Sequence, residues 1–256
     1  AYLQRNLRPR VASITIHPPG TVFQKPFSTG ELEIAGYDGD LPDRRLTAQA
    51  ATTTPGMIST GPQAPALGRR VYQKGLMTFV WRAEDDNNDE LQFDVLYRRD
   101  GETAWKGLKG GLTDPILVWD TTSVPNGTYL LRVMASDTVA NPPGNALAGH
   151  MDSTSFDIDN APPTIGISGV RREGSRTVIA FDVRDEHSAV QKVEYSVEGD
   201  RWRSIYPKDG ISDSRTEQFE LVLEGDAGTR GVVIRATDAL NNVSSARGEA
   251  PARTQP

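Results

Sequence analysis

The sequence predicts an all-β chain of two tandem antiparallel β-sandwiches with a long irregular N-terminal arm or insertion. Two observations lead to this prediction. Apolar residues occur in short runs that alternate with polar ones, which is the period of a half-buried strand and not of a helix. The 24 glycines and 17 prolines of the 256-residue chain fall between these runs, as turn formers do. Because the chain has no cysteine, each core must be held by hydrophobic burial alone.

One strand is predicted near the N-terminus, followed by a long segment without periodicity. The run VASITI, residues 11–16, alternates and stops at PPG, which is a strong strand terminator. From residue 21 to residue 70, Pro, Gly, Thr and Ala are abundant, and no period of 2 or 3.6 is sustained. We therefore expect residues 1–70 to hold a first strand and an extended arm or insertion without a core of its own.

Two further regions carry the strand pattern. Alternation is clear in MTFVW, FDVLY and YLLRVMA, and the turn-forming runs DDNND, RRDGE, PNG and NPPGN separate or follow these strands. The run DNAPPT, residues 159–164, then interrupts the pattern, because two adjacent prolines block helix and disfavour a central strand. Alternation resumes afterwards. We expect one sandwich over residues 71–160, a second over residues 161–250, and a tail over residues 251–256.

The two regions repeat the same order of features. In each, a strand is followed by an acidic turn, a Tyr-containing strand, a polar turn and a tryptophan, Trp105 or Trp202. Each then has a late strand that ends in Ala-x-Asp, at Asp137 and at Asp238. A shared order of this kind indicates tandem duplication of one module.

Particular residues carry a resemblance to known families. Trp81, the run FDVLYRRDGETAWK and the corner VPNGTYLLRVMASD resemble the second strand, the third strand with its turn, and the sixth strand of a fibronectin type III domain. The second module, with RATDALNNVS near its end, is similar to bacterial immunoglobulin-like repeats. The resemblance implies a location at the C-terminal end of a large secreted bacterial protein, often one that contains a β-propeller. It implies no catalytic residues.

Several functional classes are not expected. The formal net charge is −6, and paired arginines are scattered along the chain, so nucleic-acid binding is not predicted. No apolar run approaches the roughly 18 residues of a membrane span. The three histidines, His17, His150 and His187, have no metal-site spacing, and there is no nucleophile elbow or phosphate loop. We expect the chain not to be an enzyme.

Acidic loops are the candidate sites for metal. One set is Asp85, Asp86, Asp89 and Asp137. These residues follow the second and sixth strands, whose loops meet at one end of a fibronectin-type sandwich, so their oxygens could converge on Ca²⁺. A second set is Asp157, Asp159, Asn160, Asp185, Glu186, Asp238 and Asn241. Here DIDNAPP resembles the cadherin linker, which implies calcium between domains. The alternative for both sets is that Asp and Asn serve only to form turns.

The three tryptophans Trp105, Trp119 and Trp202 leave two interpretations open, a sugar-binding platform or packing. The equivalent places of Trp105 and Trp202 in the two repeats favour a shared structural role.

The sequence as a whole predicts a non-catalytic structural, adhesion or spacer module, secreted or at the surface of a bacterial cell, with protein partners or neighbouring domains. Its first residues lack the apolar segment of a signal peptide, so we expect a processed chain or a piece of a longer protein. Two alternatives stay open. The chain could be the substrate- or carbohydrate-binding accessory region of a larger secreted enzyme. It could also be a subunit of an extracellular filament or sheath assembled through the arm, where Met57 and Ile58 are the candidate strand. The oligomeric state is left open.

Overall fold

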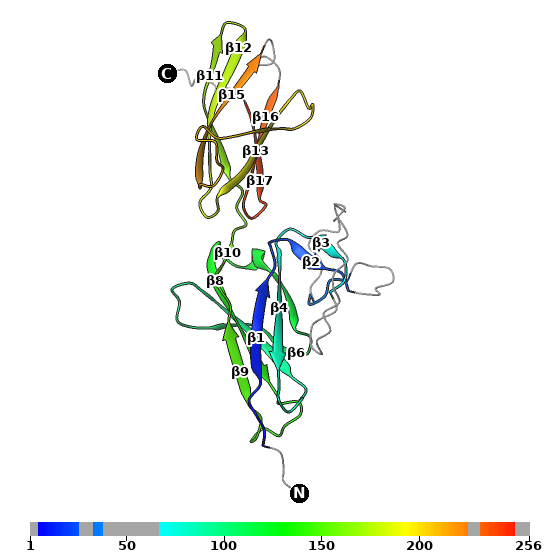
Figure 1. The fold of residues 1–256 in the computed structure, drawn as a ribbon. Coiled ribbons are helices and arrows are strands. Elements are labelled where there is room, and N and C mark those ends of the chain that lie inside the picture. Colours follow the sequence, from blue (N-terminus) through cyan, green and yellow to red (C-terminus); the bar gives the residue numbers. More distant parts are fainter. Residues whose placement is uncertain (1–4, 26–32, 38–66, 225–230, 249–256) are drawn as a thin grey trace. The chain divides into compact units, whose positions relative to one another are not determined.

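The chain folds into two compact units, Ala1–Ile158 and Asp159–Pro256, each of which is a β-sandwich. The computed structural model describes residues 5–25, 33–37, 67–224 and 231–248 (Figure 1). Within these residues the regular structure is β-strand apart from one short 3-10 turn. No helix among them has the length and apolar character needed to cross a membrane.

The first unit consists of a three-stranded and a larger sheet, and all their pairings are antiparallel. The smaller sheet has the order β1-β4-β7, with β1 at Arg10–Ile16, β4 at Leu76–Glu84 and β7 at Ile116–Asp120. The larger sheet has the order β10-β8-β5-β6, with β10 at Phe156–Ile158, β8 at Gly127–Ser136, β5 at Gln92–Arg99 and β6 at Lys106–Leu112. The 3-10 turn η1, Thr121–Ser123, follows β7. This strand order is that of a fibronectin type III or immunoglobulin-like sandwich.

The last strand of the first unit is interrupted. Strand β9, Ala148–Asp152, and strand β10 both pair with β8, at successive stretches of it. Between them the Ser153 N–H donates to the Leu131 carbonyl at 2.8 Å, and Ser153 Oγ accepts from the Leu131 N–H at 3.0 Å. The serine side chain therefore satisfies a backbone donor of β8 where the ladder is broken.

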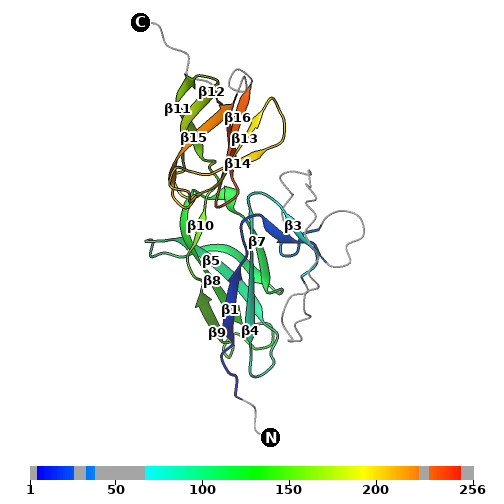
Figure 2. The same ribbon diagram turned by 45° about the horizontal axis from the view of Figure 1, so that its top comes forward.

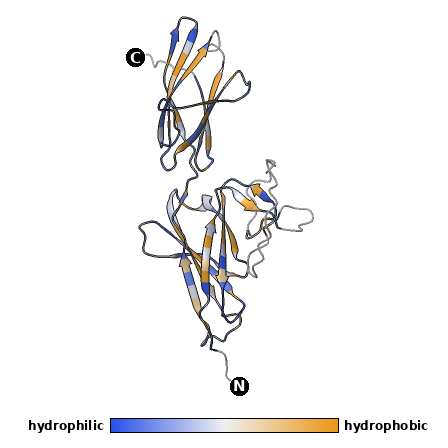
Figure 3. Cartoon of the chain, viewed as in Figure 1, coloured by the Kyte–Doolittle hydropathy of each residue, from blue (hydrophilic) through white to orange (hydrophobic). Residues whose placement is uncertain are grey.

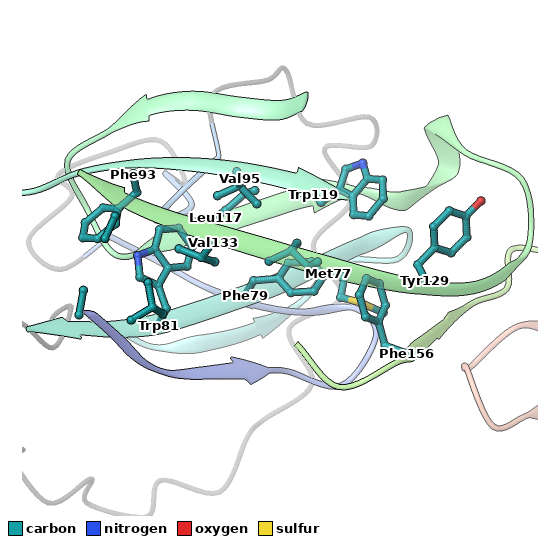
Figure 4. Close-up of a cluster of buried hydrophobic side chains, with 14 of the residues drawn as sticks. Met77, Phe79, Trp81, Phe93, Val95, Leu117, Trp119, Tyr129, Val133 and Phe156 are labelled. Carbon is teal, nitrogen blue, oxygen red and sulfur yellow. The ribbon is translucent and has the colours of Figure 1, made fainter. Parts of the chain in front are cut away.

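The core of the first unit is aromatic and lies between its two sheets (Figure 4). Trp81 on β4 is 1% exposed, and its ring meets that of Phe93 edge-on at 5.4 Å. At the start of β8, Tyr129 Oη donates to the Pro125 carbonyl at 2.7 Å, which is the tyrosine corner of this class of sandwich. Both features are those that the sequence predicts from Trp81 and from the run PNGTY.

The insertion between β1 and β4 is anchored at its described ends. Strands β2, Thr21–Phe23, and β3, Arg70–Tyr72, pair with each other beside β4 (Figure 1). A small cluster formed by Val22, Ile34, Leu76 and Val118 packs insertion and sandwich residues together. The ends of the insertion therefore share a core with the sandwich, which its lack of periodicity did not indicate. Residues 38–66, with Met57 and Ile58, lie outside the described part of the chain.

The second unit repeats the same strand order (Figure 2). Its three-stranded sheet is β11-β12-β15, at Thr164–Glu173, Arg176–Arg184 and Thr216–Glu224. Its four-stranded sheet is β14-β13-β16-β17, at Arg203–Ile205, Val190–Val197, Val232–Asp238 and Val243–Arg247. The rings of Phe181 and Phe219 stack at 5.0 Å in the core. Hydrophobic and hydrophilic residues alternate along these strands (Figure 3), so each sheet has one buried face.

Candidate metal-binding loops

In the first unit, two loops bring three carboxylates together. Asp85 and Asp89 lie in the turn after β4, and Asp137 directly follows β8. One carboxylate oxygen from each lies within 4.8 Å of the others. We call these three residues the first acidic cluster. Asp86, which the sequence also suggested, is exposed and is not a member of the cluster.

Part of the first acidic cluster holds the loops in shape. Asp85 Oδ1 accepts hydrogen bonds from the N–H groups of Asn87 at 2.8 Å and of Asp89 at 3.1 Å. Asp137, which is fully buried, accepts from the Leu147 N–H at 2.6 Å through Oδ1. These contacts are typical of aspartates that form turns. The turn-forming interpretation therefore accounts for the Oδ1 atoms of Asp85 and Asp137.

Two other buried oxygens at this end of the sandwich have no donor among the described residues. They are Asp85 Oδ2 and Asn6 Oδ1. The orientation of the Asn6 amide is fixed, because its nitrogen donates to Asp137 Oδ2 at 2.7 Å and to the Asn145 carbonyl at 2.8 Å. Buried acceptors without donors are costly unless a cation or water meets them. Oxygen ligands of this kind are those that Ca²⁺ prefers.

The second unit has an equivalent arrangement. Carboxylate oxygens of Asp159, Asp185 and Asp238 lie within 4.8 Å of one another, and we call these residues the second acidic cluster. Asp238 is the last residue of β16, much as Asp137 directly follows β8, and it is also fully buried. Asp185 follows β12 and accepts from the N–H groups of His187 and Ser188, both at 2.8 Å.

Asn242 connects the parts of the second acidic cluster. Its Nδ2 donates to Asp238 Oδ2 at 2.9 Å and to the Asp159 carbonyl at 2.8 Å. Asp238 Oδ1 in turn accepts from the N–H groups of Asn242 at 2.7 Å and of Leu240 at 2.9 Å. Asn241 is exposed and occupies the left-handed region at φ +66°, which asparagine tolerates. The buried partner of the aspartates is therefore the second asparagine of the pair.

The remaining residues of the predicted second set lie elsewhere. Asp157 belongs to β10 of the first unit, where its Oδ1 accepts from Thr128 Oγ1 at 2.7 Å. Asn160 is half-buried, and Glu186 is exposed, with its backbone carbonyl accepting from Arg215 at 3.3 Å. The structure does not bring the carboxylates of Asp157 and Glu186 into either cluster.

The charges of the second acidic cluster affect Asp159. Burial raises the pKa of the Asp159 carboxyl above its ordinary value, and the negative charges of Asp185 and Asp238 raise this pKa further. The hydrogen bond from the Ala161 N–H, at 3.0 Å, opposes the shift. The Asp159 carboxyl, buried near two other carboxylates, therefore keeps its proton to a higher pH in the folded state than it does in the unfolded chain.

This shift gives a testable pH dependence. The folded second unit holds the Asp159 proton more tightly than the unfolded chain does. The free energy of unfolding of the second unit should therefore fall as the pH rises through the pKa that Asp159 has in the folded state. In EDTA, Asp159→Asn should reduce this fall and raise the stability at neutral pH. Urea unfolding of the second unit between pH 4 and pH 8 measures both effects.

Glu186→Gln is the control for that experiment, because it removes the same charge from an exposed position next to Asp185. It should leave the pH dependence close to that of the unaltered chain. An Asp159→Asn chain whose stability falls with pH as steeply as the unaltered chain would contradict the argument.

Each of the three tryptophans contacts residues of its own unit. Trp119 is buried in the core, 6% exposed. Trp105 is contacted by the guanidinium carbons of Arg98 at 4.9 Å and Arg132 at 4.3 Å from its ring centre. Trp202 is contacted in the same way by Arg235 at 4.0 Å. The shared role of Trp105 and Trp202 is therefore stacking against arginine, outside both hydrophobic cores.

The arginines of these pairs are themselves held by carboxylates. Arg132 on β8 makes two hydrogen bonds to Asp152 at 2.6 and 2.9 Å. Arg235 on β16 makes two to Glu194 Oε2 at 3.1 and 2.6 Å. In both units, a carboxylate, an arginine and a tryptophan thus form one connected group. Sequence periodicity predicts the strand positions of the arginines, but it does not identify the tryptophan that each contacts.

Comparison with known proteins gives little beyond this. No family model matches the sequence, and no curated protein matches it. Among solved structures, the chain is similar to the crystal structure of the chicken CNTN1 FN1-FN3 domains, with 16% identity over 68% of this chain and a TM-score of 0.28. The alignment spans 61% of that chain, which is less than two thirds. A TM-score of this size supports no argument. The sandwich class follows instead from the strand order, the buried Trp81 and the tyrosine corner.

Proposed function

We propose that this chain is a non-catalytic structural module of a secreted or cell-surface protein, with loops that bind calcium. The observation that carries the proposal is the end of the first sandwich, where Asn6 Oδ1 and Asp85 Oδ2 are buried without donors beside the first acidic cluster. A divalent cation would satisfy these oxygens and offset the repulsion among the three carboxylates.

The expected affinity agrees with a location outside the cell. The candidate ligands are oxygens only, and several lone pairs of the aspartates are already used by backbone N–H groups. A site with few free carboxylate oxygens binds calcium weakly, in the range of about 10⁻⁴ to 10⁻³ M that extracellular modules have. Such a site would hold calcium where the calcium concentration is millimolar. The bound ion would then contribute to the rigidity of the loops that form the site.

The carbohydrate-binding alternative receives less support from the geometry. A sugar would stack on an open aromatic face, but Trp119 is buried and the Trp105 ring is contacted by two guanidinium groups. Trp202 is 39% exposed, and Arg235 lies over its ring. The filament alternative depends on the arm around Met57, which is outside the described residues.

Calcium should raise the melting temperature of the first unit. At a calcium concentration about 100 times Kd, binding to the folded state stabilises by about 2.7 kcal/mol. For a unit of this size, that corresponds to a shift of roughly 5–10 °C. Scanning calorimetry of the full chain in calcium and in EGTA measures the shift, and isothermal titration measures binding directly.

Two aspartate variants test whether calcium binds at the first acidic cluster. Asp89→Asn removes one carboxylate charge while leaving an oxygen to accept the 2.7 Å bond from Asn141 Nδ2, so it should reduce the calcium shift to less than half. The control is Asp114→Asn, an exposed aspartate between β6 and β7, which should keep the full shift. If calcium produces neither heat nor a shift in the unaltered chain, the acidic loops are turn formers only and the calcium part of the proposal fails.

A further inference from the structure

An aspartate or asparagine that precedes glycine can react with the glycine nitrogen, because no side chain on the glycine hinders the approach. The described residues hold two Asp-Gly pairs and one Asn-Gly pair, which are Asp100-Gly101, Asp209-Gly210 and Asn126-Gly127. A further Asp-Gly pair, residues 38–39, lies outside the described part of the chain. The reaction joins the nitrogen to Cγ of the preceding side chain, so the local structure decides which pair is placed to react.

The two Asp-Gly pairs have similar surroundings. Both aspartates and both glycines are exposed. Gly101 has a φ of +82° and Gly210 a φ of +89°, a conformation that glycine adopts without strain. Exposure and backbone conformation therefore do not distinguish the pairs, but the hydrogen-bond partner of each glycine nitrogen does.

At the first pair, the glycine nitrogen faces the side chain that would react with it. The Gly101 N–H donates to Asp100 Oδ1 at 3.0 Å. The Glu102 N–H donates to the Arg99 carbonyl at 3.0 Å, so Asp100 and Gly101 are the central residues of a tight turn between β5 and β6. This turn holds the carboxyl group beside the nitrogen, which is the arrangement that favours reaction within one molecule.

At the second pair, both groups have other partners. The Gly210 N–H donates to the Pro207 carbonyl at 2.9 Å. Asp209 Oδ1 accepts instead from the Ile211 N–H at 3.2 Å. Both hydrogen bonds must break before the Asp209 carboxyl can meet the Gly210 nitrogen, so this pair is held away from reaction.

The Asn-Gly pair is held by the sheet, although Asn-Gly is the more reactive sequence in an unfolded chain. Strand β8 begins at Gly127, which pairs with Ile158 of β10. The start of this strand must open locally before the Gly127 nitrogen can approach the Asn126 side chain. The structure therefore reverses the order of reactivity that the sequence alone would give.

We propose that Asp100 is a site of spontaneous isomerisation to isoaspartate. The Gly101 nitrogen forms a bond to Asp100 Cγ and gives up its proton, and the carboxyl hydroxyl leaves with a proton as water, which closes a succinimide ring. Water then adds to one of the two ring carbonyls, and the bond from that carbon to the nitrogen breaks. Cleavage at Cγ restores aspartate, whereas cleavage at the backbone carbonyl carbon leaves the chain running through Cβ and Cγ. One water leaves and one enters, so no other reactant takes part.

The product lengthens the main chain of the turn by one carbon atom. Within this turn, the Arg98 guanidinium donates to the Glu102 carbonyl, and the same guanidinium stacks on Trp105. Displacement of the Glu102 carbonyl should therefore loosen the contact between Arg98 and Trp105. This change takes place away from both acidic clusters and does not depend on calcium.

The test follows isoaspartate in the full chain at neutral pH and 37 °C over several weeks, in EGTA, with and without guanidinium chloride. Trypsin cleaves after Arg99 and Lys208, so the peptides of residues 100–106 and 209–215 each begin with one Asp-Gly pair. Chromatography separates the isoaspartyl form of each peptide from the aspartyl form of the same mass. In the folded chain, isoaspartate should form at Asp100 at least about fivefold faster than at Asp209.

The unfolded chain is the control for chemistry alone. In guanidinium chloride, Asp100 and Asp209 should isomerise at rates within about twofold of each other, because neither carboxyl is then held in place. Asn126 should react fastest of the three under these conditions. In the folded chain, its rate should be at least about tenfold lower than in the unfolded chain.

A variant tests the role of the glycine nitrogen. Asparagine tolerates a positive φ, so Gly101→Asn should keep the turn while its side chain hinders the attack. Isomerisation at Asp100 should then slow by at least about fivefold. Gly210→Asn is the matched control, and it should leave the rate at Asp100 unchanged. The comparison of the two Asp-Gly pairs in the unaltered chain decides the proposal even if Gly101→Asn fails to fold.

Several results would overturn the proposal. Equal rates at Asp100 and Asp209 in the folded chain would show that the hydrogen bond to Gly101 selects nothing. Absence of isoaspartate at Asp100 in the folded chain, while the unfolded chain accumulates it, would show that the turn protects this pair. A folded Gly101→Asn chain that isomerises as fast as the unaltered chain would contradict the proposed attack by the nitrogen.

Discussion

Replacing Trp81 with alanine should destabilise the first unit by about 3–5 kcal/mol, the usual cost of deleting a large aromatic from a core. The reason is its position: Trp81 is 1% exposed and lies between the two sheets against Phe93. A 3–5 kcal/mol loss is a large share of the stability of an ordinary domain. The first unit should therefore unfold well below its normal melting temperature.

Calorimetry of the full chain should show this loss in one transition only. The second unit has its own core, centred on Phe181 and Phe219, so its transition should remain near its usual temperature. Trp105→Ala is the control, because Trp105 contacts arginines outside the core, and its loss should cost about 1–2 kcal/mol. Equal effects of the two substitutions would mean that the described core does not hold the unit together.

Replacing Asp238 with alanine should destabilise the second unit by about 3–5 kcal/mol. The carboxylate accepts from the N–H groups of Leu240 and Asn242 and from the Asn242 side chain. Asp238 is completely buried, so these donors would lose their partner without gaining water, at about 1–3 kcal/mol each. Relief of repulsion from Asp159 and Asp185 acts in the other direction. We expect the loss of three hydrogen bonds to be the larger effect.

Asp238→Asn separates the two contributions. It removes the charge but keeps an oxygen for the backbone N–H groups, so it should cost no more than about 1–2 kcal/mol. Urea unfolding of the second unit in EDTA, at neutral pH, measures both variants. A stable Asp238→Ala chain would show that repulsion dominates the second acidic cluster and that its hydrogen bonds contribute little.

Most of the fold can be predicted from the sequence, because strands and corners leave patterns within short stretches of neighbouring residues. Alternation alone identifies strands such as β8, where every second residue from Tyr129 to Ala135 is buried. The corner at Pro125 and Tyr129 is a short motif with one geometry. The aspartates of the first acidic cluster lie in the loops after β4 and β8, so knowledge of the sandwich is enough to place Asp85 and Asp137 together.

Other features could not be predicted from the sequence, because they depend on contacts between residues that are far apart in the chain. Asn6 is 131 residues from Asp137, and nothing in the neighbouring sequence indicates that it contacts the first acidic cluster. The choice of Asn242 over Asn241 as the buried residue depends on which of the two takes the left-handed turn position. The stacking of Trp105, which directly precedes β6, on Arg132 of β8 requires both strands to be in register with β5, which lies between them. A pattern with a period of two cannot supply that register.

The first strands of the two units, β1 and β11, should join their sheets differently, because a long insertion follows β1. In the second unit, β11 and β12 form a hairpin in which Glu173 faces Arg176, so this pairing needs almost no loop closure. In the first unit, β1 reaches β4 only across the long insertion, and the entropy of closing that loop opposes the pairing. We therefore expect β1 to join late in folding and to detach first on unfolding. Asn6 lies shortly before β1, which begins at Arg10, so a cation held by Asn6 and the first acidic cluster would also fasten this strand.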